Sequence, residues 1–95
     1  MKNRIELEFH RADTRLAGNP YGKEVFIAQV REKIDYTMLN TIVFPENIEK
    51  VASSFVQGFF EEIIKNVGYE KFDNVIQIEA RNEVLVENIR KDLIF

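Results

Sequence analysis

The chain has 95 residues, 45% of them hydrophobic and 31% charged, and a formal net charge of −3, which suits one globular domain over residues 1–95. Its lack of Cys excludes disulfides and cysteine nucleophiles, and its single histidine, His10, leaves no histidine pair to bind zinc. The acidic balance disfavours binding to nucleic acid or anionic lipid, and no apolar run is long enough to span a bilayer, so we predict a cytoplasmic protein that binds neither nucleic acid nor membrane.

The first half of the chain predicts a strand, a loop and a helix. Residues Arg4–Phe9 alternate polar and apolar, which is typical of a half-exposed strand at or near a sheet edge. His10–Tyr21 shows no sustained period and is predicted as a loop, with a short extended piece around Thr14–Ala17. Asn19 and Pro20 then indicate a helix start. The apolar positions of this helix fall on one side, at Phe26, Ile27, Val30 and Ile34.

The second half predicts two more strands and two more helices. Thr41–Phe44 is apolar on both faces, as in a central parallel strand, and the connection Pro45–Lys50 includes a turn or short extended segment. Val75–Ala80 is predicted as a strand with one wetter face, and Asn82 caps a final one-sided helix. The alternation predicts an α/β fold with a largely parallel or mixed sheet of about four strands and three helices.

The central helix has marked ends and an unusually wide apolar face. Ser54 is predicted as its N-cap, with Gln57 completing a capping box, and Gly68 as its stop before a loop over Tyr69–Asn74. Its apolar residues cover about half of the circumference, at Phe55, Val56, Phe59, Phe60, Ile63, Ile64 and Val67. Either the helix is sandwiched within the domain, or part of this arc is exposed to a partner or to a second copy in a homodimer.

The segment Val51–Phe60, coming after the strand Thr41–Phe44, resembles the STAS-like domain family of unknown function. These small bacterial and phage proteins are related to the STAS domains of anti-sigma-factor antagonists. Thr14–Gly18 also resembles the Arg-containing segment before the first helix of the family. The resemblance covers Thr14 to about Leu93, and it implies a STAS-like fold and a non-enzymatic, regulatory role in protein–protein interaction.

The resemblance also implies a serine switch. In the antagonist branch, a serine at the start of the central helix is phosphorylated by a partner that is both a histidine-kinase-like ATPase and an anti-sigma factor. Here that serine is Ser54, with Ser53 as its neighbour. The chain departs from the pattern at two places, since Phe44-Pro45 ends the strand where the family often has Asp, and Phe55 replaces the Gly of the antagonists. The alternative role of Ser54 is a plain helix cap.

The sequence raises three possibilities for a functional site: a partner surface, a small-ligand site and a catalytic site. A partner surface is predicted at the start of the central helix, formed by Phe44, Phe55, Gln57 and Phe59. The alternative is a phosphate, nucleotide or other small-ligand site, in which Arg11, Arg15 and Lys23 accompany the free amides of the helix start. No acid–base pair, metal ligand set or cofactor motif emerges, because the adjacent Glu61 and Glu62 do not face each other, so catalysis is not predicted.

Overall fold

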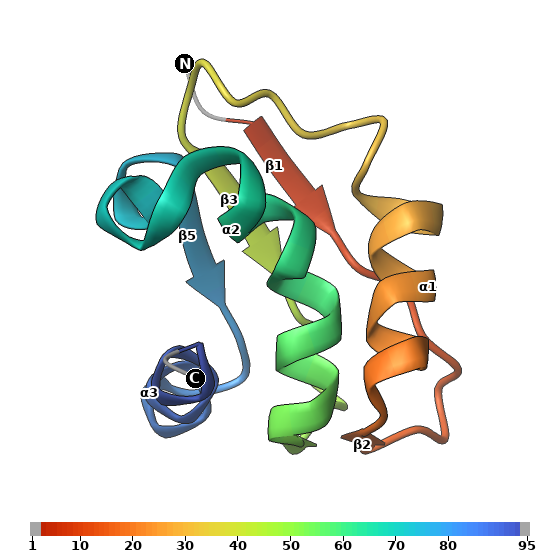
Figure 1. The fold of residues 1–95 in the computed structure, drawn as a ribbon. Coiled ribbons are helices and arrows are strands. Elements are labelled where there is room, and N and C mark those ends of the chain that lie inside the picture. The colour runs from red at the N-terminus through yellow and green to blue at the C-terminus, as the bar shows by residue number, and fades with distance from the viewer. Residues whose placement is uncertain (1–2, 94–95) are drawn as a thin grey trace.

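The predicted alternation of strands and helices is present in a computed structural model, which describes residues 3–93. Figure 1 shows the order of the elements along the chain. They are β1 (Asn3–Glu6), β2 (Arg15–Leu16), α1 (Asn19–Gln29), β3 (Asn40–Val43), β4 (Lys50–Val51), α2 (Ser53–Val75), β5 (Ile76–Glu79) and α3 (Glu83–Asp92).

Two parallel sheets are formed from these strands. The larger sheet has the order β1-β3-β5, so β1 is an edge strand and β3 the central parallel strand, as predicted. Ile42 of β3 stands between Ile5 of β1 and Ile78 of β5. The short strands β2 and β4 pair with each other. The strand β2 falls within the predicted extended piece Thr14–Ala17, and β4 begins at the end of the connection predicted to include a turn or short extended segment. The α/β class and the mostly parallel sheet are thus confirmed, with three strands in one sheet and two in the other.

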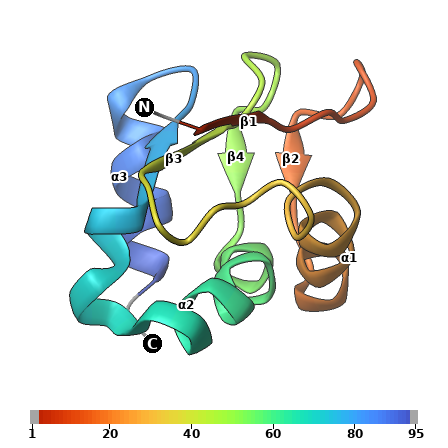
Figure 2. The same cartoon turned by 90° about the horizontal axis from the view of Figure 1, so that it is seen from above.

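The helices α1 and α2 lie on the same side of the larger sheet. Both crossovers, β1 to β3 and β3 to β5, step in the same direction across the sheet, and right-handed crossovers then place their helices on one face. Figures 1 and 2 show this arrangement from two directions. The opposite face carries exposed polar side chains such as Arg4 and Gln77. The domain core therefore lies between the sheet and the two helices.

Most of the wide apolar arc of α2 is buried inside this core, whereas Ile64 and Val67 are only partly buried. Phe55, Phe59 and Ile63 are fully buried, and the Phe59 ring packs against those of Phe26 in α1 and Phe44 after β3. The arc is therefore used within the domain, between the sheet and α1. In α1 the prediction for Ile27 is wrong, because this side chain is 49% exposed. Phe26 and Val30 are buried as predicted, and the helix also turns Gly22 and Val25 inward, which leaves Ile27 on the outer side.

The helices α1 and α2 approach each other through two glycines. A Cβ atom at Gly22 would lie 2.4 Å from the carbonyl oxygen of Phe55, and one at Gly58 would lie 2.1 Å from that of Asn19. Real Cβ atoms do not come so close to backbone atoms, so each helix presents a glycine to the backbone of the other. This contact is possible only because neither position has a side chain.

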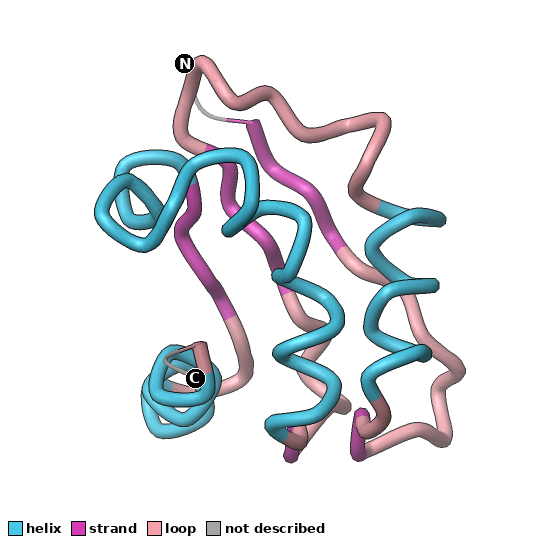
Figure 3. Tube along the Cα trace, viewed as in Figure 1, coloured by secondary structure: helices cyan, strands magenta, loops and turns pink. Residues whose placement is uncertain are grey.

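The helix α2 is broken at Gly68 rather than ended there. Gly68 has φ 76° and ψ 165°, a conformation that only glycine adopts readily, so the predicted stop is in the right place. The predicted loop over Tyr69–Asn74 is wrong, because the chain turns there into a further helical segment that buries Phe72 and Val75 (Figure 3). No helix among residues 3–93 is both long and apolar enough to cross a membrane.

The glycine contact gives a stability prediction. Gly58→Ala is expected to lower the free energy of unfolding by about 3 kcal/mol, because the added methyl group forces the two helices apart. Helix propensity alone predicts the opposite sign, since alanine stabilises a helix interior by about 1 kcal/mol relative to glycine. Urea denaturation separates the two effects, with Gln57→Ala as a neighbouring control in the same helix. A Gly58→Ala variant as stable as the wild type would show that the helices do not pack in this way.

Candidate functional site

The starts of α1 and α2 lie together beside the short sheet formed by β2 and β4 (Figure 1). The strand β4 runs almost directly into α2, because the backbone N–H of Ala52 still donates to the carbonyl oxygen of Leu16, at 2.7 Å. Consequently Ala52 occupies the N-cap position, and no side chain caps the helix. The predicted N-cap at Ser54 and its capping box with Gln57 are both wrong, since the helix begins at Ser53 and its N-cap, Ala52, lies two residues before Ser54.

The Ser54 hydroxyl makes a different contact. Its oxygen accepts a hydrogen bond from the backbone N–H of Gly18, at 3.0 Å, across the gap between α2 and the start of α1. Gly18 occupies the N-cap position of α1 with φ 101°, a region that disfavours other residues. Ser54 is half-buried, whereas Ser53 is exposed. The two adjacent serines therefore differ, because Ser54 joins two helix starts and Ser53 faces solvent.

An aromatic cluster lies beside this contact. Tyr21 packs edge-on against Phe55, with ring centroids 5.6 Å apart, and Phe9 packs edge-on against both rings. Phe55 is fully buried and Phe9 partly buried, but Tyr21 remains 38% exposed. Partial burial, together with the charges of Asp13 and Glu24, raises the pKa of the Tyr21 hydroxyl. The side chains of Phe9, Tyr21, Ser53, Ser54 and Gln57 are hereafter called the α2-start surface.

The predicted partner residues contribute unequally to this surface. Phe44, Phe55 and Phe59 are buried in the core, so the expectation that they form an accessible surface is wrong. Gln57 is half-buried and remains accessible in part. Tyr21 is not indicated by the sequence pattern, because it lies at the boundary between a predicted loop and a helix, where periodicity predicts neither burial nor exposure.

The three predicted anion-binding cations do not converge. Lys23 forms an ion pair with Glu61 at 3.3 Å and lines the groove between α1 and α2. Arg15, in β2, lines a separate hollow next to α3, whereas Arg11 lies in an exposed turn and lines neither. The fold therefore does not bring Arg11, Arg15 and Lys23 together into a single anion site.

The acidic residues of α2 are engaged in ion pairs. Glu61 contacts Lys65 at 3.1 Å, which confirms the i,i+4 pair expected from their spacing, and also contacts Lys23. Hydrogen bonds from Lys65 and Lys23 lower the pKa of the Glu61 carboxyl. Glu62 binds the guanidinium of Arg31 through both of its oxygens. Within residues 3–93, no group of three or more His, Asp or Glu side chains could hold a metal ion.

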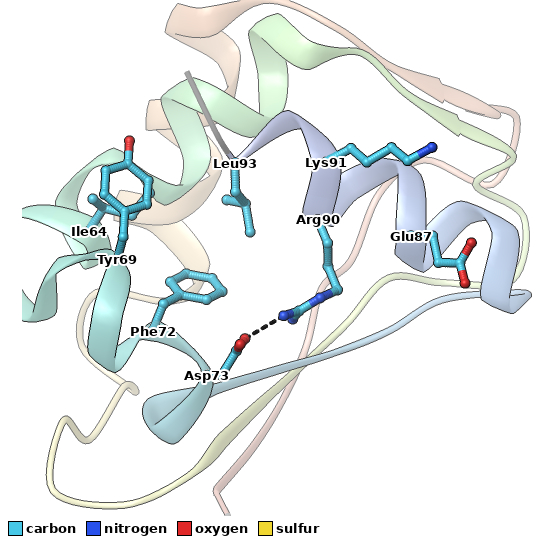
Figure 4. Close-up of a pocket in the computed structure, with 8 residues that line it drawn as sticks. All are labelled: Ile64, Tyr69, Phe72, Asp73, Glu87, Arg90, Lys91 and Leu93. Carbon is cyan, nitrogen blue, oxygen red and sulfur yellow. Dashed lines mark hydrogen bonds and ion pairs between the residues drawn. The ribbon is translucent and has the colours of Figure 1, made fainter.

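A second hollow lies between the last part of α2 and α3 (Figure 4), with a cavity volume of about 470 Å³. Its lining residues are Ile64, Tyr69, Phe72, Asp73, Glu87, Arg90, Lys91 and Leu93. The surface inside is mainly apolar, and Asp73 pairs with Arg90 at its edge. Charges of both signs on the rim cancel, so the hollow shows no preference for a ligand of either charge.

Comparisons with protein-family models, with curated proteins and with solved structures find no match to this chain. The relationship to the STAS-like family therefore stays a prediction.

The contact between Ser54 and Gly18 can be tested by stability measurements. Ser54→Ala is expected to lower the free energy of unfolding by about 1 kcal/mol, because the N–H of Gly18 loses its acceptor in a partly buried place. Ser53→Ala is the matched control and should change stability by less than about 0.5 kcal/mol, as is usual for exposed positions. Equal effects of the two substitutions in urea denaturation would contradict the assignment of different roles.

The Glu61 ion pairs predict a pH dependence of stability. Since the folded state lowers the pKa of Glu61, its contribution is fully present above the unfolded pKa of about 4.3 and is lost as the pH falls through the lower folded value. Denaturation between about pH 3 and pH 7 should show a shallower acid-side loss for Glu61→Gln than for the wild type. Glu70→Gln serves as the control, because Glu70 pairs with no cation that the structure describes; identical profiles for all three proteins would refute the prediction.

Proposed function

We propose that this protein is a non-enzymatic regulatory module that binds a protein partner through the α2-start surface. The observation that carries the proposal is the exposed aromatic edge of Tyr21 beside the two serines. Tyr21 and Ser54 both lie against Gly18, where an added Cβ atom would be 3.7 Å from that of Tyr21 and where Ser54 accepts the backbone N–H. An apolar ring and two hydroxyl groups therefore lie close together.

The chemistry of this surface suits protein recognition. Tyrosine supplies a large, rigid contact area with a polar end, and it is enriched among the residues that dominate binding at protein interfaces. The Tyr21 ring is supported from below by Phe9 and Phe55, so it loses little conformational freedom on binding. The half-buried amide of Gln57, one turn along α2 from Ser53, adds a polar group at the rim.

We further propose that phosphorylation at the start of α2 controls whether the partner binds, as the resemblance to the antagonists implies. A phosphate at Ser54 would carry about two negative charges near the free amides of the first turn, which favours it electrostatically. The same phosphate would replace the hydroxyl that accepts from Gly18, and the half-buried site would have to open to hold it. Phosphorylation would therefore change the position of the start of α1 relative to the start of α2.

The proposed partner is a histidine-kinase-like ATPase, the class that acts on antagonist serines. The homodimer considered from the sequence has a weaker basis, because most of the apolar arc that suggested it is buried within the domain. We expect such a partner to phosphorylate Ser54. The neighbouring Ser53, whose hydroxyl is more exposed, is the second candidate for the modification.

Affinity capture of the tagged protein from its native host, read by mass spectrometry, tests this proposal. We expect an ATPase of the histidine-kinase type to be recovered, with phosphate on Ser54 or Ser53. Tyr21→Ala should reduce its recovery about tenfold, the effect of losing one major interface residue.

Tyr69→Ala is the matched control, because Tyr69 is an exposed tyrosine on the distant second segment of α2. It should leave recovery unchanged, and thermal unfolding should show that both variants are folded. The proposal fails if no such ATPase is recovered, or if the two tyrosine variants recover it equally.

A further inference from the structure

A hollow of about 610 Å³ lies between the β2–β4 pair and α3, and none of the residues of the aromatic cluster lines it. Figure 2 shows the two short strands side by side, with α3 beyond β4. The buried side chains of Leu16, Val51 and Leu85 form an apolar floor. Its polar lining comes from three separate elements, namely Arg15 of β2, Glu49 and Lys50 at β4, and Asn88, Lys91 and Asp92 of α3.

Among residues 3–93, the cations of this hollow have no ion-pair partners. Arg15 and Lys50 are register partners on neighbouring strands, so two positive charges stand side by side. Within the part of the chain that the structure describes, neither of them forms an ion pair, and neither does Lys91. Like charges at directly paired strand positions repel and destabilise a sheet. An anion bound between them would remove this repulsion.

The acidic residues that line the hollow further define which ligand groups it can bind. Glu49 is paired with Arg81 at 3.7 Å, so its charge is already balanced. Asp92 pairs with no described cation, and together with the Asn88 amide it can accept hydrogen bonds from hydroxyl groups. The hollow therefore has two cations on its β2–β4 side, with Lys91 as a third on α3, and hydrogen-bond acceptors on α3 at Asn88 and Asp92, above a floor suited to an apolar ring or chain.

We propose that this hollow binds a small phosphate ester that carries hydroxyl groups, such as a sugar phosphate or a nucleoside monophosphate. Arg15 and Lys50 contact the phosphate, with Lys91 adding a third positive charge, and Asp92 accepts from the hydroxyls. The volume is in the range of small-ligand sites in proteins. This site is separate from the α2-start surface, and the proposal does not depend on the protein partner.

Titration of the ¹⁵N-labelled protein with ribose 5-phosphate, followed by amide chemical shifts, tests the proposal. We expect saturable shifts confined to residues 15–17, 49–52 and 88–92, weaker binding of inorganic phosphate, and none of ribose. Arg15→Gln and Lys50→Gln should each weaken binding about fivefold, the effect of losing one partly exposed charge pair. Because each substitution also removes the repulsion between Arg15 and Lys50, neither should lower the midpoint of thermal unfolding.

Lys71→Gln is the control, since Lys71 is an exposed lysine in the second segment of α2 that does not line the hollow. It should bind ribose 5-phosphate like the wild type. Shifts that do not saturate or that occur elsewhere would overturn the proposal, as would binding that is equal in the Arg15, Lys50 and Lys71 variants.

Discussion

The contact of α1 with α2 through Gly22 and Gly58 is the constraint on which the rest of the structure depends. Because each glycine meets backbone atoms of the other helix, the relative position of the two helices is set by main-chain contact rather than by flexible side chains. This close approach brings Gly18 within hydrogen-bonding distance of the Ser54 hydroxyl and places Tyr21 on the ring of Phe55. The α2-start surface is thus a consequence of how two helices pack.

The hollow beside Arg15 and Lys50 can be understood from a repeated unit of secondary structure. A long strand, a short strand and a helix follow one another twice, as β1-β2-α1 and β3-β4-α2, and equivalent elements lie in parallel beside each other. The third strand, β5, has no short strand after it and leads to α3 through a brief turn. As a result α3, rather than a third short strand, contacts β4, and the hollow beside Arg15 and Lys50 is formed there.

Sequence patterns predicted the elements that depend on local chemistry. Hydrophobic alternation identified β1 and β5, and an apolar run without alternation identified β3, although the predicted ends of these strands differ from those observed. The Asn82 side chain accepts the Leu85 N–H at 2.8 Å, as a predicted N-cap should. The Ser54 cap failed because a local rule competed with a contact 36 residues away, to Gly18. Nothing local distinguishes a serine that caps its own helix from one that accepts from another.

Long-range contacts also account for the other features that the sequence did not indicate. Asn40 is fully buried at the start of β3, where it accepts from the N–H of Asp35 and donates to the carbonyl oxygen of Val75. The pairing of β2 with β4, and with it the closeness of Arg15 to Lys50, depends on segments 35 residues apart. The α/β class could therefore be predicted, whereas the composition of the α2-start surface and of the hollow could not.

Native-state hydrogen exchange of the Gly18 amide tests most directly whether the close packing of α1 on α2 holds this surface together. The N–H of Gly18 precedes α1 and has the Ser54 hydroxyl as its acceptor, so its protection reports on that contact. Our account predicts that Gly18 exchanges about as slowly as the core amides of α2, through global unfolding. Exchange as fast as that of the exposed turn at Arg11 would contradict it, because the two helix starts would then separate freely in the native protein.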